Sequence, residues 1–369
     1  MRGYFVGFGF IIASWLMCGS TVAIAQNYSG SESCQGCHQE IYEQYQKSGH
    51  PYKIQAVKGA PPSYPPGTSP GVPHPPHDED WKTISYVIGG FGWKARFMDQ
   101  EGYILTGENR QYNLPNSNLG KDAHWVAYEG SELSRKPYTC GDCHTTGWVA
   151  TGADGPHQDG LPGIHGTWVE PGVTCEACHG ASAAHVASPK EFKPTTEENC
   201  GSCHSRGDPN QIDAKGGLIR HHEQYEDLLA SPHKALACGT CHDPHKSTVY
   251  QAGGYLGDDK TCKSCHQNVE IKLAAKADVA CQTCHMPHAV KSATSITVTF
   301  AEGSVQKGDL RTHIHRISTD PDWKMFTDDG NFVRVDEEGK AYLTLDHACL
   351  TCHVDKDRKW AQTYAKKVH

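Results

Sequence analysis

The sequence predicts a fold of mostly coil and short α-helices with a few β-hairpins. Its apolar side chains alone are too few to form an ordinary hydrophobic core. Hydrophobic residues make up only 37% of the 369 positions, and the mean hydropathy is −0.59. A chain this polar buries less apolar surface than a globular domain of its size needs. An additional apolar component must therefore complete the core.

A repeated pentapeptide indicates what that component is. The pattern Cys-x-x-Cys-His occurs eight times. Two cysteines at this spacing form thioethers with the vinyl groups of one haem, and the histidine that follows becomes the proximal ligand of its iron. Cys₄ zinc ribbons and a disulfide framework also use paired cysteines, but neither explains a histidine after every pair. The sequence therefore predicts eight haem c groups and the fold class of a multihaem cytochrome c, in which coil and short helices pack around stacked haems.

The predicted haem residues follow from their positions in the pentapeptide. The first and fourth positions supply the attachment cysteines Cys34, Cys37, Cys140, Cys143, Cys175, Cys178, Cys200, Cys203, Cys238, Cys241, Cys262, Cys265, Cys281, Cys284, Cys349 and Cys352. The fifth position supplies the proximal ligands His38, His144, His179, His204, His242, His266, His285 and His353.

The sixth iron ligands are expected to be mostly histidines. After residue 25 the chain has three methionines, whereas sixteen histidines lie outside the pentapeptides. Bis-histidine ligation gives low-spin iron with lower potentials than His/Met ligation. From their positions beside motifs or predicted helices, we expect the ligands to come from His50, His157, His185, His221, His222, His233, His245 and His313. His74, His77 and His369 are not favoured, and His288, His315 and His347 are left open.

One histidine pair has a specific expectation. His221 and His222 open a predicted helix over 221–230, which Pro232 ends. Neighbouring residues on a helix point about 100° apart. The pair would therefore serve two different haems, or one member would lie on the surface.

The first 25 residues predict a secretory signal peptide. Arg2 precedes an apolar run over 4–18, and Ala23-Ile24-Ala25 is a typical cleavage site. An uncleaved anchor is disfavoured because the run is short and contains two glycines, and Cys18 lacks the preceding small residue of a lipoprotein signal. We expect residues 26–369 to be exported, to the periplasm or the cell exterior, with no stable membrane span.

Residues 26–369 are interpreted as one octahaem unit, with a division near residue 135 as the alternative. Its parts are a Pro-rich arm at 60–76, a β-rich insertion at 81–130, a haem-dense core at 138–290, and C-terminal hairpins with the last haem at 295–369. The arm has eight prolines and is either a surface loop or a segment that docks on a neighbouring subunit. Strands are predicted at 83–88, 95–98 and 103–105, with hairpins near 297–303 and 332–343. These strands are interpreted as surface decoration.

The formal charge of −8 becomes more negative when haem propionates are added. An acidic surface argues against nucleic acid as a partner and allows cationic proteins or metal ions.

The stretch Trp168-Val169-Glu170-Pro171-Gly172-Val173-Thr174-Cys175-Glu176-Ala177-Cys178-His179-Gly180, with His185 beyond it, resembles the multihaem cytochromes c of nitrogen and metal respiration. Ser48-Gly49-His50 and Cys284-His285-Met286-Pro287 are similar as well. These cytochromes are electron-transfer relatives of hydroxylamine oxidoreductase and the pentahaem nitrite reductases. The resemblance implies bis-histidine haems in alternating parallel and perpendicular stacks. Octahaem reductases of this group often have a Lys-ligated haem, whereas all eight motifs here end in His.

The predicted function is electron transfer to redox partner proteins or extracellular acceptors. The alternatives are an octahaem oxidoreductase acting on a small nitrogen or sulfur compound, and a haem store. For assembly, four features favour an extracellular head-to-tail homopolymer: export without a second membrane anchor, a high haem density, the Pro-rich arm, and the separation of the first and last motifs from the central six. A monomeric periplasmic shuttle is the alternative.

Overall fold

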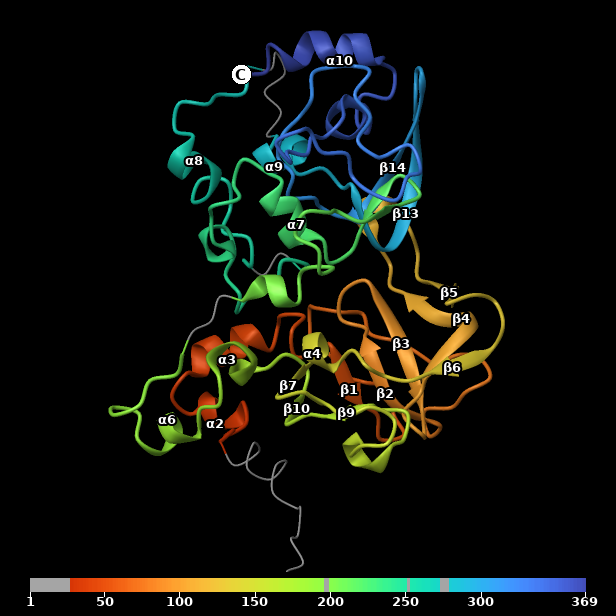
Figure 1. The fold of residues 1–369 in the computed structure, drawn as a ribbon, viewed down its shortest axis with the longest axis vertical. Helices are drawn as coiled ribbons and strands as arrows, with labels where there is room; N and C mark the ends of the chain where they lie inside the picture. Colours follow the sequence, from red (N-terminus) through yellow and green to blue (C-terminus); the bar gives the residue numbers. More distant parts are fainter. Residues whose placement is uncertain (1–26, 196–198, 251–252, 273–278) are drawn as a thin grey trace, which may run out of the picture.

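The computed structural model describes residues 27–195, 199–250, 253–272 and 279–369 (Figure 1). The predicted signal peptide lies outside these residues. The described α-helices have four to eight residues each, and long coil segments connect them, which confirms the predicted fold class. They are α2 (Glu32–Gln35), α3 (Gln39–Tyr45), α4 (Gly141–His144), α5 (Cys175–His179), α6 (Ala183–Ala187), α7 (Gln224–Leu229), α8 (Cys262–Cys265), α9 (Cys281–His285) and α10 (Arg358–Ala365). None of these described helices is long and apolar enough to cross a membrane.

The larger sheet has six antiparallel strands, and it contains the strands predicted at 83–88, 95–98 and 103–105. Its strands are β1 (Ile54–Ala56), β2 (Ile84–Gly89), β3 (Lys94–Asp99), β4 (Ile104–Asn113), β5 (His124–Tyr128) and β6 (Ser134–Lys136). On one face, Ile88 and Met98 pack with Trp168, and on the other, Val87 and Phe97 form a second cluster. Because both faces are buried, the sheet is part of the core rather than surface decoration.

The Pro-rich segment 60–76 lies against the turn between β2 and β3. The Tyr64 hydroxyl donates to the Gly89 carbonyl at 3.0 Å, and the Ser69 hydroxyl donates to the Gly90 carbonyl at 2.6 Å. Val72 is buried in the same cluster as Val87. The segment therefore packs on its own sheet, as the surface-loop alternative expects.

The second sheet consists of β11 (Ala214–Lys215), β12 (Leu218–Arg220), β13 (Val290–Phe300) and β14 (Gly303–Leu310). The β13–β14 hairpin confirms the prediction near 297–303 and is longer than expected. The predicted hairpin at 332–343 forms only isolated bridges, such as the one between Val335 and Ala341. Two small ladders complete the strands and pair β7 (Thr145–Thr146) with β10 (Glu170–Pro171), and β8 (Val149–Ala150) with β9 (Gly166–Thr167).

The two sheets touch through polar contacts. The Lys94 ammonium of β3 donates to the Ser292 carbonyl, and the Asn113 amide of β4 donates to the Ala293 carbonyl at 3.2 Å. Figure 1 shows α2 and α10 at opposite ends of the long axis, with the sheets to one side. Most of the short motif helices lie along the other side.

Candidate haem-binding sites

Each Cys-x-x-Cys-His motif forms a single helical turn. In five motifs the histidine amide donates to the carbonyl of the first cysteine at 2.9–3.0 Å, as His38 does to Cys34 and His204 does to Cys200. The other three motifs form α4, α5 and α9. Residues three apart lie on one face of such a turn, so both thiols point to the same side and the histidine follows directly. This local geometry suits covalent attachment of one haem per motif.

Thiols of different motifs lie close together, and these sulfurs stand for the thioether sulfurs of the haem-loaded protein. Burial raises the pKa of the Cys175 thiol to about 12, and the neighbouring Cys34 is the next largest cause of this shift. Burial, followed by Cys284, raises the pKa of Cys349 to about 12 as well. Similar neighbours are Cys143 with Cys203, Cys178 with Cys200, Cys241 with Cys262, and Cys281 with Cys262. The motifs therefore follow one another closely in space.

Six motif histidines face a second imidazole ring whose centroid is 5.8–6.5 Å away. An imidazole nitrogen lies about 2 Å from a first-row transition metal, so two rings that share one iron have centroids about 6 Å apart. The facing pairs are His38–His185 at 6.4 Å, His179–His245 at 6.2 Å, His204–His50 and His204–His222 at 6.5 Å, His242–His313 at 6.1 Å, His266–His233 at 6.1 Å, and His285–His369 at 5.8 Å.

Backbone carbonyls orient several of these rings. The Nδ1 atoms of His185 and His285 lie 2.8 and 2.9 Å from the carbonyls of Phe192 and His315. A ring whose Nδ1–H donates to a carbonyl keeps the lone pair on Nε2, the atom that can bind iron.

His221 and His222 differ from the expectation, because α7 begins only at Gln224. The pair lies in a turn where His222 has φ 74°, so the two rings meet at 4.4 Å instead of pointing apart. His222 faces His204 at 6.5 Å, and His50 faces the same ring at 6.5 Å. The Nδ1 atom of His221 lies 3.2 Å from the Arg206 guanidinium.

His157, His74 and His77 lie away from the histidine rings of the Cys-x-x-Cys-His motifs. His157 faces His165 at 6.2 Å, and its Nδ1 lies 2.7 Å from the Ile164 carbonyl. His74 and His77 lie on the six-stranded sheet beside Trp125. None of these three rings contacts a motif histidine within the described residues.

Two motif histidines have other surroundings. In the described part of the chain, His144 makes no ring contact with another imidazole, although His222 lies near enough to interact with it electrostatically. Burial lowers the pKa of His144 to about 4, and the positive charges of Lys53, Arg96 and Lys94 act in the same direction. The ring of His353 packs against the indole of Trp360, with 4.8 Å between the centroids. Among the described residues, no imidazole ring contacts His353.

The cations near His144 come partly from a strand to which the sequence analysis gave no chemical role. Lys94 and Arg96 are two residues apart on β3, so both side chains leave the same face of the sheet. Burial, followed by Arg96, lowers the pKa of Lys94 to about 7. The Lys-x-Arg spacing was a visible signal, but only the fold brings it beside the second motif.

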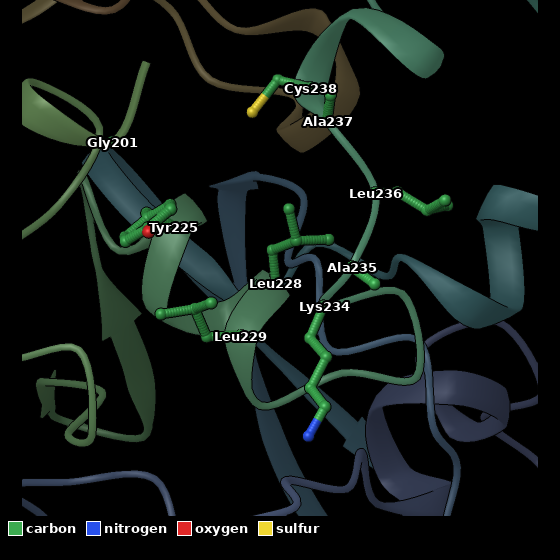
Figure 2. A pocket seen from close by; sticks show the side chains of 9 residues that line it. All are labelled: Gly201, Tyr225, Leu228, Leu229, Lys234, Ala235, Leu236, Ala237 and Cys238. Carbon is green, nitrogen blue, oxygen red and sulfur yellow. The ribbon is translucent and has the colours of Figure 1, made fainter. Parts of the chain in front are cut away.

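Two pockets lie next to motif cysteines. The first, of about 310 Å³, lies between the motif at Cys200 and Cys238, and Figure 2 shows Leu228 near its centre, with Tyr225 and Leu229 on one side and Leu236 on the other. The second, of about 200 Å³, lies between the motifs at 281 and 349 and is lined by His288, Lys307 and Arg311. Apolar walls suit a porphyrin face, and cationic side chains suit its propionates, so these residues fit haem.

Comparison with known proteins gives partial matches in two families. Residues 256–369 match the outer membrane cytochrome MtrC/MtrF-like family, domains II/IV, and residues 126–205 match cytochrome c7 and related cytochrome c. The dissimilatory sulfite reductase MccA of Wolinella succinogenes is 26% identical over 250 residues. That match covers 53% of this chain and 35% of the relative, so the chain matches about a third of that protein's length.

Two solved structures share the fold. The octahaem sulfite reductase MccA of Wolinella succinogenes, form II, has a TM-score of 0.61 and 18% identity, and the match covers 92% of this chain and 71% of that one. The outer cell wall cytochrome OcwA has a TM-score of 0.54 and 17% identity, with 92% and 86% covered. Motifs and fold together define this protein as a multihaem c-type cytochrome. Its fold resembles that of an outer cell wall cytochrome and that of an octahaem sulfite reductase.

Proposed function

We propose that the protein carries electrons along eight covalently bound haem c groups, most of them with bis-histidine ligation. The observation that carries this proposal is the set of six motif histidines that each face a second imidazole at 5.8–6.5 Å. An iron with two histidine ligands has no free position for a substrate. It can change oxidation state with little movement of its surroundings, which suits electron transfer.

Five predicted distal ligands are proposed on this geometry. His185 serves the haem of His38, His245 that of His179, His313 that of His242, and His233 that of His266. His204 is faced by both His50 and His222, and only one of them can complete its iron. The other ring then lies at the edge of a neighbouring haem.

The contacts between motifs support one continuous path. Thiol neighbours connect the motif at 34 to those at 175, 200 and 140, and connect those at 238, 262, 281 and 349. The pocket in Figure 2 lies between the motifs at 200 and 238, where the two series meet. We infer that electrons enter near one end of the long axis in Figure 1 and leave near the other.

We further infer that the protein works outside the cytoplasm, in the periplasm or at the cell exterior, with redox proteins or extracellular acceptors as partners. The predicted leader, the match to an outer membrane cytochrome family and the likeness to a cell wall cytochrome support this. The Pro-rich segment, which favoured a homopolymer, is bound to its own sheet. We therefore propose an individual electron carrier rather than a filament.

Intact mass measurement of the purified protein, combined with a redox titration, tests the proposal. We expect eight haem additions and a broad range of low potentials. Six or fewer additions would contradict the haem count, and a single high potential would contradict the ligation.

A second candidate function is favoured by the surroundings of His144. Lys53, Lys94 and Arg96 are the cations that act on this histidine, and it makes no ring contact with another imidazole in the described residues. Such a site suits a small anion at the iron, with Lys94 able to donate a proton near neutral pH because burial lowers its pKa to about 7. The fold relative is a sulfite reductase. We therefore propose reduction of a small sulfur or nitrogen oxyanion as the alternative activity.

Two measurements separate these functions. An enzyme of this kind contains a high-spin haem that binds carbon monoxide when reduced, and it oxidises a reduced dye when sulfite or nitrite is added. If the wild-type protein is entirely low-spin and inactive with both anions, the enzymatic function is excluded and electron transfer is the function that remains.

A further inference from the structure

We propose that His369 is the sixth iron ligand of the haem attached at Cys281 and Cys284. The inference deepens the proposed function, because it rests on the bis-histidine ligation argued above. The His369 ring lies 5.8 Å from that of His285, with 24° between the planes. This separation matches the other facing pairs, of which His38–His185 has the most similar angle, 29°.

Both rings present the nitrogen that iron needs. The Nδ1 atom of His285 lies 2.9 Å from the His315 carbonyl, and that of His369 lies 3.3 Å from the Glu270 carbonyl. With both Nδ1–H groups donated to the backbone, the lone pairs are on the Nε2 atoms. Two Nε2 lone pairs on facing rings about 6 Å apart are the arrangement that an iron between them requires.

The segment that carries His369 is held in place on both sides. The Lys272 amide donates to the Val368 carbonyl at 2.7 Å, which holds the segment against the coil after the sixth motif. Upstream, α10 is fixed because the Arg358 guanidinium donates twice to the Asp346 carboxylate at 2.8 Å. Asp346 begins the turn that carries Cys349. Ligation by His369 would therefore tie the haem at 281 to the last motif through α10.

Two other histidines near this motif are less suited to the position. The carbonyl of His315 receives the bond from Nδ1 of His285, so its backbone lies on the side of the ring away from Nε2. His288 lines the pocket that also contains Cys352, which belongs to the last motif. Neither ring contacts that of His285 among the described residues.

The test uses the haem-loaded protein and five substitutions. We expect His369→Ala to convert one haem to the high-spin state, detected by electron paramagnetic resonance, and to create about one equivalent of carbon monoxide binding in the reduced protein. His369→Met should restore low-spin iron but raise the potential of one haem, because thioether ligation favours the reduced state. The matched control is His124→Ala, since the His124 ring bonds Asn113 and Asp122 and faces no motif histidine among the residues that the structure describes.

A His369→Ala protein that stays low-spin and binds no additional carbon monoxide overturns the inference. A high-spin haem after His315→Ala instead would assign the position to His315. His185→Ala separates this failure from failure of the general ligation scheme. If His185→Ala creates a high-spin haem and His369→Ala does not, bis-histidine ligation stands and only the assignment of His369 is wrong.

Discussion

The rings of His179 and His245 lie 6.2 Å apart with only 2° between their planes. By contrast, the ring planes of the pair His266 and His233 meet at 76°. The angle between axial imidazole planes controls the anisotropy of low-spin ferric iron, so the two haems should give different resonance signals. We expect the ferric protein to show both a parallel-plane and a perpendicular-plane low-spin species. A spectrum with one species alone would contradict the assigned ring pairs.

His245→Ala should open the haem at Cys175 and Cys178. Loss of the facing imidazole leaves a five-coordinate or water-ligated iron, so one haem becomes high-spin and its potential rises. Optical spectroscopy and a redox titration measure both changes. His74→Ala is the matched control because His74 lies on the six-stranded sheet, and it should leave the spectrum unchanged.

Glu176 is expected to hold the first motif against the third. Its carboxylate is 2% exposed and accepts bonds from the amides of Ser29 at 3.0 Å, Gly30 at 2.9 Å and Ser182 at 2.7 Å. Glu176→Ala leaves these amides without an acceptor, which should lower the free energy of unfolding by about 2–4 kcal/mol. Thermal unfolding measures the loss. Glu40→Ala on the exposed side of α3 should have an effect within about 0.5 kcal/mol of zero.

Asp78 and Arg110 give a pH-dependent prediction. A hydrogen bond from the Arg110 guanidinium lowers the pKa of Asp78, and Arg110 itself is 5% exposed. Because the folded pKa lies below the unfolded one, the contribution to stability is present above the unfolded pKa of about 3.9 and is lost as the pH falls through the folded value. Asp78→Asn should cost about 1–2 kcal/mol at pH 7, since the half-exposed carboxylate is partly screened.

Denaturation curves at pH 7 and below pH 3 provide the check. The difference between Asp78→Asn and wild type should shrink at the lower pH. An equal difference in stability between Asp78→Asn and wild type at both pH values would show that the Asp78–Arg110 ion pair does not hold the end of the Pro-rich segment. Asp355→Asn, in an exposed pair with Lys356, is the control and should change little.

Arg96→Gln should lower the potential of the haem at Cys140 and Cys143. A cation near an iron disfavours its oxidised state, so removal of the charge should shift one potential downward by on the order of tens of millivolts. A potentiometric titration followed optically measures this shift. Arg135→Gln is the control, because Arg135 lies on β6 and pairs with Asp99 and Glu101 at the surface. An unchanged potential in Arg96→Gln would place this guanidinium away from the haem.

The local parts of this account could be predicted from the sequence, since a Cys-x-x-Cys-His turn and the strand over 84–89 depend on neighbouring residues. Distal partners depend on tertiary placement. His369 lies 84 positions from His285, and no nearby sequence feature indicated it as an iron ligand. The turn at His221 and His222 was misjudged because a positive φ at His222 separates the pair from α7. The position of Lys94 and Arg96 of β3 beside His144 could not be predicted, because alternating cations on a strand usually face solvent.

The most direct test of the central claim is the ferric resonance spectrum of the intact protein, quantified against its haem content. We predict eight haems per chain, of which at least six are low-spin with two histidine ligands. The irons bound to His144 and His353 are the ones left to differ. A protein with eight haems but fewer than six low-spin irons would contradict the claim that facing histidine pairs build an electron-transfer chain.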